Sequence, residues 1–197
     1  MVPTMAARKD PARPYHHGDL RRALLDAAVE AIESDGPAEL SLRDLARRIG
    51  VSHAAPAHHF GDKTGLLTAL ATEGYALLGD ELRRAWERTH SFLEVGVAYV
   101  GFAVAHRAHF EVMYRPELHR VDDPALEAAR DATASLLYGS AETAGAASSL
   151  EAGLAGWSLM HGVAWLWLNR ALPDQLGDDP EQIARTLGNY LFGSPPK

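Results

Sequence analysis

Apolar residues recur at three- and four-residue steps through most of this 197-residue chain, and that spacing predicts amphipathic helices. The first stripe runs from Leu20 to Ile32, and the segment Asp35-Gly36-Pro37 ends it with a glycine followed by a proline. No segment alternates with a period of two between hairpin turns, so we expect no strands. The pattern predicts an all-α protein of about nine helices.

Most of the remaining helices lie in the second two-thirds of the chain. A new helix begins at Lys63-Thr64 and continues to about Arg88. The segments after it break at prolines and glycines, and they predict helices near residues 91–106, 107–115, 123–142, 148–171 and 180–193.

The stretch from Ser41 to Phe60, SLRDLARRIGVSHAAPAHHF, predicts two short helices around a tight turn. Ser41 followed by Asp44 has the spacing of a capping box at the start of the first helix. Gly50 suits the turn because glycine adopts positive φ without steric cost. We expect Ser52 to cap a second helix that runs to about His59. This is the helix-turn-helix arrangement, whose second helix can lie in the major groove of DNA.

Sequence-specific binding of double-stranded DNA is therefore the leading hypothesis. The first turn of the second helix is the part that usually meets base edges. An imidazole can donate to guanine and a methyl group can contact thymine. Arg43 is read equally well as a DNA contact or as a solvated charge. The expected contacts from this reasoning are Arg43, Ser52, His53, Ala54 and Ala55.

Composition and charge limit the kinds of protein that this sequence can encode. The chain has no cysteine and a formal net charge of −7. Residues 1–63 carry 9 basic and 9 acidic side chains, so the acidic surplus lies in the rest of the chain, outside the expected DNA-binding part. The N-terminus lacks the apolar core of a signal peptide, and the apolar stretch near 157–168 is too short to span a bilayer. We expect a cytoplasmic protein without a membrane segment, a metal or another cofactor.

The run LLDAAVEAIESDGPAELSLRDLARRIGVSHAAPAHHFGDKTGLL resembles the DNA-binding domain of TetR/AcrR-type transcriptional regulators. The resemblance implies that the second helix of the motif enters the major groove, and that the later helices form a ligand-binding and dimerisation domain. It also implies phosphate or base contacts from His58, His59 and Lys63. Many members carry a tyrosine that contacts phosphate at the position of Ala57, and here that contact is absent.

A second, shorter resemblance lies near the C-terminus. Trp157, His161 and Gly162 in GWSLMHGVAWLWL look like the Trp-His-Gly signature of one subclass of these regulators, and the opening YHHGDLRRALL is similar to that subclass as well. The prolines and basic residues at the N-terminus, with no helical periodicity, predict a flexible basic arm over residues 1–17. The two resemblances predict a helix-turn-helix domain over 18–65 and a helical effector-binding and dimerisation domain over 66–197.

In that last domain, aromatic and sulfur-containing side chains are candidates for lining a small-molecule pocket, although helical spacing of aromatics is more often core. For Trp157 and His161, four residues apart, we favour a packed pair with a structural role. The candidates are Trp86, Phe92, Phe102, Phe110, Met113, Tyr114, Trp157 and His161.

The two C-terminal helices are apolar, and pairing with their copies would make a four-helix interface in a homodimer. The alternative is that these helices only cover the core of their own subunit. Their apolar residues are Trp165, Leu166, Leu168, Ile183, Leu187, Tyr190 and Leu191.

Two other functions are weighed against a DNA-binding repressor: a metal-dependent enzyme and a transcriptional activator. His106, His109 and Glu111 hint at a metal-dependent enzyme, but the paired Glu-x-x-His segments of bundle metal sites are absent, as are HExxH and GxSxG motifs. A ligand-controlled activator would use the same DNA chemistry as a repressor. We expect a homodimeric, ligand-responsive repressor on a palindromic operator, and the chain leaves its effector and operator sequence open.

Overall fold

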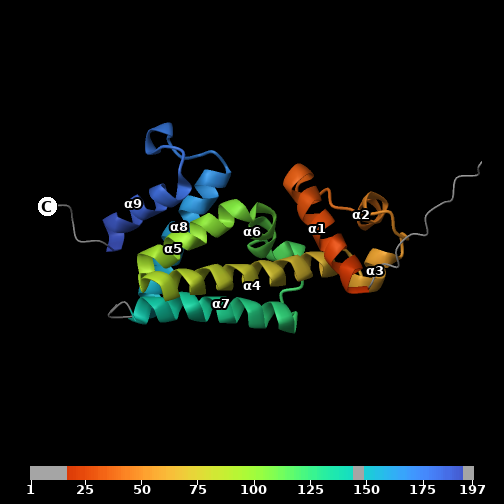
Figure 1. The fold of residues 1–197 in the computed structure, drawn as a ribbon, viewed down its shortest axis with the longest axis horizontal. Coiled ribbons are helices and arrows are strands. Elements are labelled where there is room, and N and C mark those ends of the chain that lie inside the picture. Colours follow the sequence, from red (N-terminus) through yellow and green to blue (C-terminus); the bar gives the residue numbers. More distant parts are fainter. Residues whose placement is uncertain (1–16, 144–148, 193–197) are drawn as a thin grey trace, which may run out of the picture.

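The computed structural model describes residues 17–143 and 149–192. Over these ranges the chain forms nine α-helices, two 3₁₀ turns and no strand, as predicted. A small head contains α1 (His17–Asp35), α2 (Leu42–Arg48) and α3 (Ala55–Phe60), and α4 (Lys63–Thr89) runs from it along the larger body (Figure 1). The larger body adds α5 (Phe92–Ala105), α6 (Arg107–Met113), a 3₁₀ turn (Pro116–Leu118), α7 (Pro124–Thr143), α8 (Ser149–Leu168), a second 3₁₀ turn (Asp174–Leu176) and α9 (Pro180–Phe192). The predicted basic arm lies outside the described residues except for His17, where α1 begins.

The head is held together by the apolar stripe of α1. Leu24, Leu25 and Ala28 are buried on α1 and share a core with Leu45 of α2 and Phe60 of α3. Because each helix contributes few buried side chains, the head has a small core that depends on the docking of all three.

The local signals around α2 act largely as predicted. The Ser41 Oγ accepts from the Asp44 N–H at 3.4 Å, and Gly50 has a φ of +71° in the turn. The Asp44 carboxylate pairs with Arg47 at 2.8 Å instead of returning to the Ser41 backbone. Of the two hydrogen bonds of the predicted capping box, the one from the Asp44 N–H to the Ser41 side chain therefore forms.

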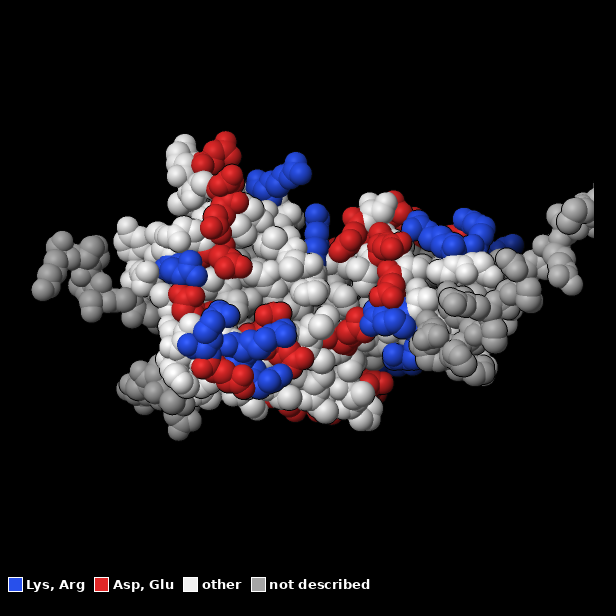
Figure 2. Space-filling model, in the orientation of Figure 1, with Lys and Arg blue, Asp and Glu red and all other residues white. Residues whose placement is uncertain are grey.

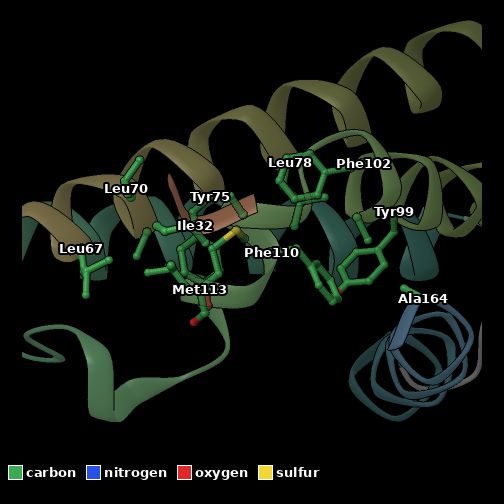
Figure 3. Packing of buried hydrophobic residues seen from close by; sticks show 14 of the residues in the cluster. Ile32, Leu67, Leu70, Tyr75, Leu78, Tyr99, Phe102, Phe110, Met113 and Ala164 are labelled. Atoms are coloured by element: carbon green, nitrogen blue, oxygen red, sulfur yellow. The ribbon is translucent and has the colours of Figure 1, made fainter. Parts of the chain in front are cut away.

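The long helix α4 connects the head to the body. Its start is capped by Asp62, whose Oδ1 accepts from the Gly65 N–H at 2.7 Å, and its end lies at His90 with a left-handed φ of 47°. With 27 residues it is about 40 Å long. Leu67, Leu70, Tyr75 and Leu78 lie along its buried side (Figure 3).

In the body, α7 lies along α4, while α5 packs against α4, α8 and α9. Thr133 Oγ1 of α7 lies 2.9 Å from the Tyr75 carbonyl of α4, to which it can donate. Arg185 of α9 donates to both carboxylate oxygens of Glu94 on α5, at 2.8 and 2.9 Å. These polar contacts fix the register of helices that otherwise meet through apolar side chains.

Two helices end two or three residues before the ends given by the sequence pattern. The helix predicted over 148–171 ends at Leu168, because Arg170 turns to a φ of 54° and the Ala171 N–H closes onto the Leu166 carbonyl at 2.8 Å. The helix predicted over 107–115 ends at Met113, because Pro116 disfavours the helical conformation of the residue before it.

Candidate DNA-recognition surface and effector cavity

One face of α3 is turned outward from the head. His53, Ala54, Ala57 and His58 are exposed along the turn and helix, whereas Pro56 and Phe60 are buried against the head. The outward face therefore carries two imidazoles between small methyl groups. Such a face lets a helix approach base edges closely while still offering hydrogen-bonding groups.

The predicted start of this helix is wrong. We expected Ser52 to cap it, but α3 begins at Ala55, and its N-cap, Ala54, makes no side-chain hydrogen bond. Ser52 instead accepts within the preceding turn, from the Ala54 N–H to its Oγ at 3.3 Å and from the Ala55 N–H to its carbonyl at 2.9 Å. The cause is Pro56, whose ring would clash with the carbonyl four residues earlier, that of Ser52, if the helix began there.

Other predicted contact residues occupy different environments. Arg43 is exposed on α2, one of three arginines on that helix, and basic side chains gather over this part of the head in Figure 2. Lys63 reaches back to the Ala38 carbonyl at 2.6 Å, which links α4 to the loop before α2. The ammonium of Lys63 retains donors beyond that bond.

The two neighbouring histidines of α3 differ in their surroundings. His58 is exposed, while His59 is half-buried with its ring 6.2 Å from that of Phe60. The Arg21 guanidinium of α1 also lies 5.3 Å from the centroid of the Phe60 ring, within the range of a cation–π contact. The end of α3 is thus fastened to α1 through Phe60.

A polar network joins the head to the body. Glu73 of α4 accepts from Arg22 of α1 at 2.5 Å and lies 3.0 Å from Nε2 of the buried His109 on α6. Burial of Glu73 alone would raise the pKa of its carboxyl group, but the hydrogen bonds from Arg22 and His109 lower it overall. The network connects one helix of the head with two helices of the body.

A second link lies beside the end of the recognition helix. Arg120, in the loop before α7, donates to both carboxylate oxygens of Asp62 at 2.9 Å, and its backbone N–H donates to Thr68 Oγ1 at 3.0 Å. The backbone hydrogen bond from Gly65, and then the Arg120 charge, lower the pKa of Asp62. This loop of the body is therefore attached to α4 directly after α3.

Two of the three candidate metal ligands of the enzyme hypothesis are neighbours, since the rings of His106 and His109 lie 5.8 Å apart. His109 is bound to Glu73, however, and Glu111 pairs with Arg115 at 3.2 Å. Over residues 17–143 and 149–192, no group of three His, Cys, Asp or Glu is arranged to hold a metal ion.

An aromatic cluster lies at the centre of the body. Trp157 Nε1 donates to Tyr99 Oη at 3.2 Å, and Tyr99 Oη lies 2.8 Å from His161 Nδ1. Around this polar chain pack the rings of Phe110 and Tyr114, the latter 4.6 Å from the His161 ring (Figure 3 shows Tyr99 beside Phe110). The predicted packing of Trp157 on His161 is present, at 5.6 Å between centroids.

Burial decides the ionisation of this cluster. It raises the pKa of Tyr99 well above its usual value and also raises the pKa of Tyr114. It lowers the pKa of His161, which favours the neutral imidazole at neutral pH. Because the indole N–H can only donate, Tyr99 accepts from Trp157, and its own hydrogen can go to His161 Nδ1.

A cavity of about 310 Å³ opens beside this cluster, between α4 and α7. Among its lining residues are aromatic side chains from five successive parts of the fold: Tyr75, Tyr99, Tyr114, Tyr138 and Trp157. Sequence reasoning named only Tyr114 and Trp157 of these as pocket residues. It missed the other tyrosines because helical spacing alone does not distinguish an aromatic that fills a core from one that borders a space.

A second cavity, of about 420 Å³, lies between α6 and α8. It is bordered by Phe110, Tyr114 and His161 together with charged side chains, among them Arg107 and Glu111. Tyr114 borders both cavities.

The remaining pocket candidates are dispersed. Trp86 packs on His90 at the end of α4, and Met113 is buried against Gly74. Phe92 borders a narrow space beside Trp157, and Phe102 faces a polar groove between α5 and α9. Among the eight candidates, then, Phe110, Tyr114, Trp157 and His161 meet at the centre of the body.

The two C-terminal helices expose large apolar side chains. Trp165 is 54% exposed on α8 and Tyr190 is 75% exposed on α9, with Leu166 exposed beside Trp165. Ile183 is buried in the core of its own subunit, contrary to its expected place at an interface, because it lies on the face of α9 that packs on α5 and α8. Leu168 and Leu187 are half-buried against the same core, and the side chain of Leu191 lies outside the described part of the chain.

Comparison with known proteins covers both the head and the body. The family model "Bacterial regulatory proteins, tetR family" matches residues 24–70, and the model "Tetracyclin repressor-like, C-terminal domain" matches residues 92–188. The chain belongs to the TetR family. TetR-family proteins of this kind are DNA-binding transcriptional regulators and are normally not enzymes. The Trp-His-Gly subclass stays a prediction.

Individual relatives agree with this family. The HTH-type transcriptional regulator BetI of Escherichia coli O139:H28 is 47% identical over 49 residues, which is 25% of this chain and 25% of BetI. The match thus spans about a quarter of the length of these curated relatives. A solved protein of unknown function from Rhodococcus sp. RHA1 is 35% identical, with a TM-score of 0.78 over 91% of this TetR-family chain and 96% of its own.

The fold of the TetR family regulator PfmR from Thermus thermophilus is also similar. Its TM-score is 0.67 at 19% identity, over 88% of this chain and 99% of PfmR, so the likeness concerns the fold. Among the described helices of the present chain, none has both the length and the apolar run needed to cross a membrane.

Proposed function

We propose that this TetR-family regulator reads DNA with the outward face of α3. The observation that carries the proposal is the exposure of His53 and Ala54 in the turn before α3 and of His58 on α3, whose other face is anchored by Phe60. We expect Arg43, which is exposed on α2, to supply a positive charge for phosphate. The other expected contacts, which border this face or support it, are Ser52, Ala55, His59 and Lys63. Base edges are then read by imidazole and methyl groups, and the arginine fixes the position of the helix on the duplex.

The regulator works as a homodimer in this proposal. Trp165, Leu166 and Tyr190 present apolar surface on α8 and α9, and a two-fold pairing of these helices would cover it. Two heads related by a two-fold axis would match a palindromic operator whose half-sites are about 34–36 Å apart.

A small-molecule effector would act through the body. The walls of the α4–α7 cavity belong to helices that are tied to the head by the Glu73 network and by the Asp62–Arg120 pair. A ligand that binds better when these helices are shifted would stabilise a spacing of the heads that no longer fits the operator. This makes the protein a repressor that its ligand releases. The alternative is an activator with the same contacts and the opposite effect on transcription.

Selection from random DNA tests the proposal. The full chain should enrich an inverted repeat, and a band-shift titration should show one dimer per repeat. His53→Ala should change the preferred base at one position of each half-site, whereas His90→Ala, at the far end of α4, should leave the preference unchanged. Failure to enrich any sequence, or enrichment unaltered by His53→Ala, would contradict the assignment of α3.

The dimer has its own test. Trp165→Glu combined with Leu166→Glu should convert the protein to monomers in sedimentation measurements, because two charges would have to be buried without partners. Val121→Glu, at an equally exposed apolar residue in the loop before α7, is the matched control and should leave the dimer intact. A dimer that survives the double change would place the interface elsewhere.

A further inference from the structure

We propose that the cavity between α4 and α7 binds an uncharged aromatic compound of about two fused rings. The proposal rests on the ligand-responsive function proposed above and specifies the chemical class of the effector. Three features support it: the walls of the cavity, the charges at its edge and the contrast with the neighbouring cavity.

The walls of the cavity favour a flat, unsaturated ligand. Tyr75 comes from α4, Tyr99 from α5, Tyr138 from α7 and Trp157 from α8, and Tyr114 follows α6. Aromatic rings prefer offset-stacked and edge-to-face contacts with other rings, and rings held by five different parts of the fold offer both orientations. At about 310 Å³ the cavity lies near the lower end of the size range of small-molecule sites.

The rings are held in place before any ligand binds. The hydroxyl group of Tyr99 is bound by Trp157 and His161 at 3.2 and 2.8 Å, and the buried ring of Tyr75 lies 6.1 Å from that of Tyr114. A preorganised aromatic wall loses little side-chain entropy when a rigid ligand binds. The Tyr75 hydroxyl group donates a long hydrogen bond to the Met113 carbonyl, at 3.4 Å. Because this bond is long, the hydroxyl group can turn toward a polar group of the ligand.

The charges at the cavity disfavour an ionic ligand. The charged side chains among its lining residues are Arg130 and Asp131, which have opposite sign, are exposed, and lie 3.9 Å apart. Burial raises the pKa of Tyr75, Tyr99 and Tyr114, so their hydroxyl groups stay protonated. Because Arg130 and Asp131 lie close together and are exposed, an anion or a cation would lose its hydration without gaining an unpaired charged partner.

The α6–α8 cavity has the opposite character. Arg107, Glu111 and Arg115 border it, and it is the place where a charged compound would find partners. The two cavities share Tyr114 as a common wall. The charge of the bound compound therefore distinguishes between them.

Three probes that share the naphthalene ring and carry one small substituent of different charge test the proposal: 2-naphthol, 2-naphthoate and 2-naphthylmethylammonium. Each would be titrated by calorimetry into the full-length protein without DNA at neutral pH. We expect 2-naphthol to bind at least about tenfold more tightly than either charged probe. Equal or tighter binding of the anion or the cation, or no saturable binding of 2-naphthol up to its solubility limit, would overturn the proposal.

A pair of variants on α7 locates the binding site. Ala134 borders the cavity, and Ala132 is exposed on the same helix outside it. Ala134→Trp should fill the space and weaken 2-naphthol binding by at least about tenfold, while Ala132→Trp should leave it unchanged. Circular dichroism shows whether each variant is folded. If Ala134→Trp does not fold, the titration of the three probes into the unaltered protein tests the proposal by itself. Equal binding by both variants would place the ligand elsewhere.

Failure of this inference and failure of the proposed function give different results. If the protein selects and binds an operator but none of the probes, the ligand class is wrong and DNA recognition stands. If no operator is selected while 2-naphthol still binds and Ala134→Trp abolishes that binding, the assignment of the cavity holds and the DNA-reading function fails.

Discussion

The head and the body of this regulator use opposite kinds of surface. The outward face of α3 carries small or polar side chains that are exposed, such as Ala57 and His58. The cavity of the body is walled by large aromatic side chains, such as Tyr99 and Trp157, that are buried or half-buried and hydrogen-bonded to one another. The difference suggests that the head achieves specificity by placing a rigid helix, whereas the body achieves it by shaping a space.

In the head, different residues therefore serve stability and recognition, whereas in the body the same residues serve both. A change on the outward face of α3 removes no packing, so it should affect DNA binding alone. A change in the aromatic cluster alters both the fold and the cavity. Substitutions in the two regions should therefore differ in the size of their effects and in the property that they change.

The largest effect on stability is expected at Phe60, whose ring anchors α3 to the head. Phe60→Ala removes a buried ring from the small core of the head and should cost about 3–5 kcal/mol, measured by chemical denaturation. His58→Ala, two residues earlier and exposed, should change stability by no more than about 0.5 kcal/mol. Equal losses in the two variants would mean that the two faces of α3 are assigned the wrong way round.

The hydroxyl group of Tyr99 should be next in importance. Tyr99→Phe leaves the Trp157 N–H and His161 Nδ1 without their shared partner and should destabilise the protein by about 2 kcal/mol, again measured by chemical denaturation. Operator affinity without ligand should stay the same, because the change lies in the body. Tyr190→Phe, at a residue that is 75% exposed, is the matched control and should be neutral. A Tyr99→Phe protein of unaltered stability would contradict the structural importance of this cluster.

The junction between head and body should show a pH dependence. Glu73 has a pKa below its ordinary value of 4.5, so its stabilising effect is complete above that value and is lost as the pH falls through the lowered pKa. Glu73→Gln should cost on the order of 1 kcal/mol at neutral pH and should flatten the loss of stability in acid.

The control for this junction is Glu87→Gln, on an exposed part of the same helix, which should keep the acid dependence of the unaltered protein. Thermal melts at a series of pH values measure both variants. An unchanged acid slope in Glu73→Gln would show that the network does not couple the two regions energetically.

The smallest effect is expected at the surface of the head. Arg43→Ala should weaken binding to all DNA sequences several-fold, reduce the salt slope of binding by about 1 and leave stability unchanged. Arg84→Ala, on the exposed side of α4 within the body, should alter none of these. Band-shift titrations at several salt concentrations distinguish the two, and a loss confined to one base pair would instead indicate a direct base contact.

Much of the fold follows from local signals in the sequence. The stripe from Leu20 to Ile32, the Ser41 cap and Gly50 predicted α1, α2 and the turn after α2, because capping and helical spacing act within a few residues. The same reasoning misplaced the start of α3. Ser52 has the residue type of a cap, but in a helix that began there the ring of Pro56 would clash with the Ser52 carbonyl.

The sequence by itself determined the helical class, the order of the helices and the family, since these depend on periodicity and on contiguous motifs. Tertiary structure alone decided that Tyr75, Tyr99 and Tyr138 surround one space, that Ile183 faces inward while Trp165 faces outward, and that Arg120 reaches Asp62. The physical reason is that a helical stripe specifies which side of a helix is apolar, whereas the partner of that side depends on how all the helices pack together.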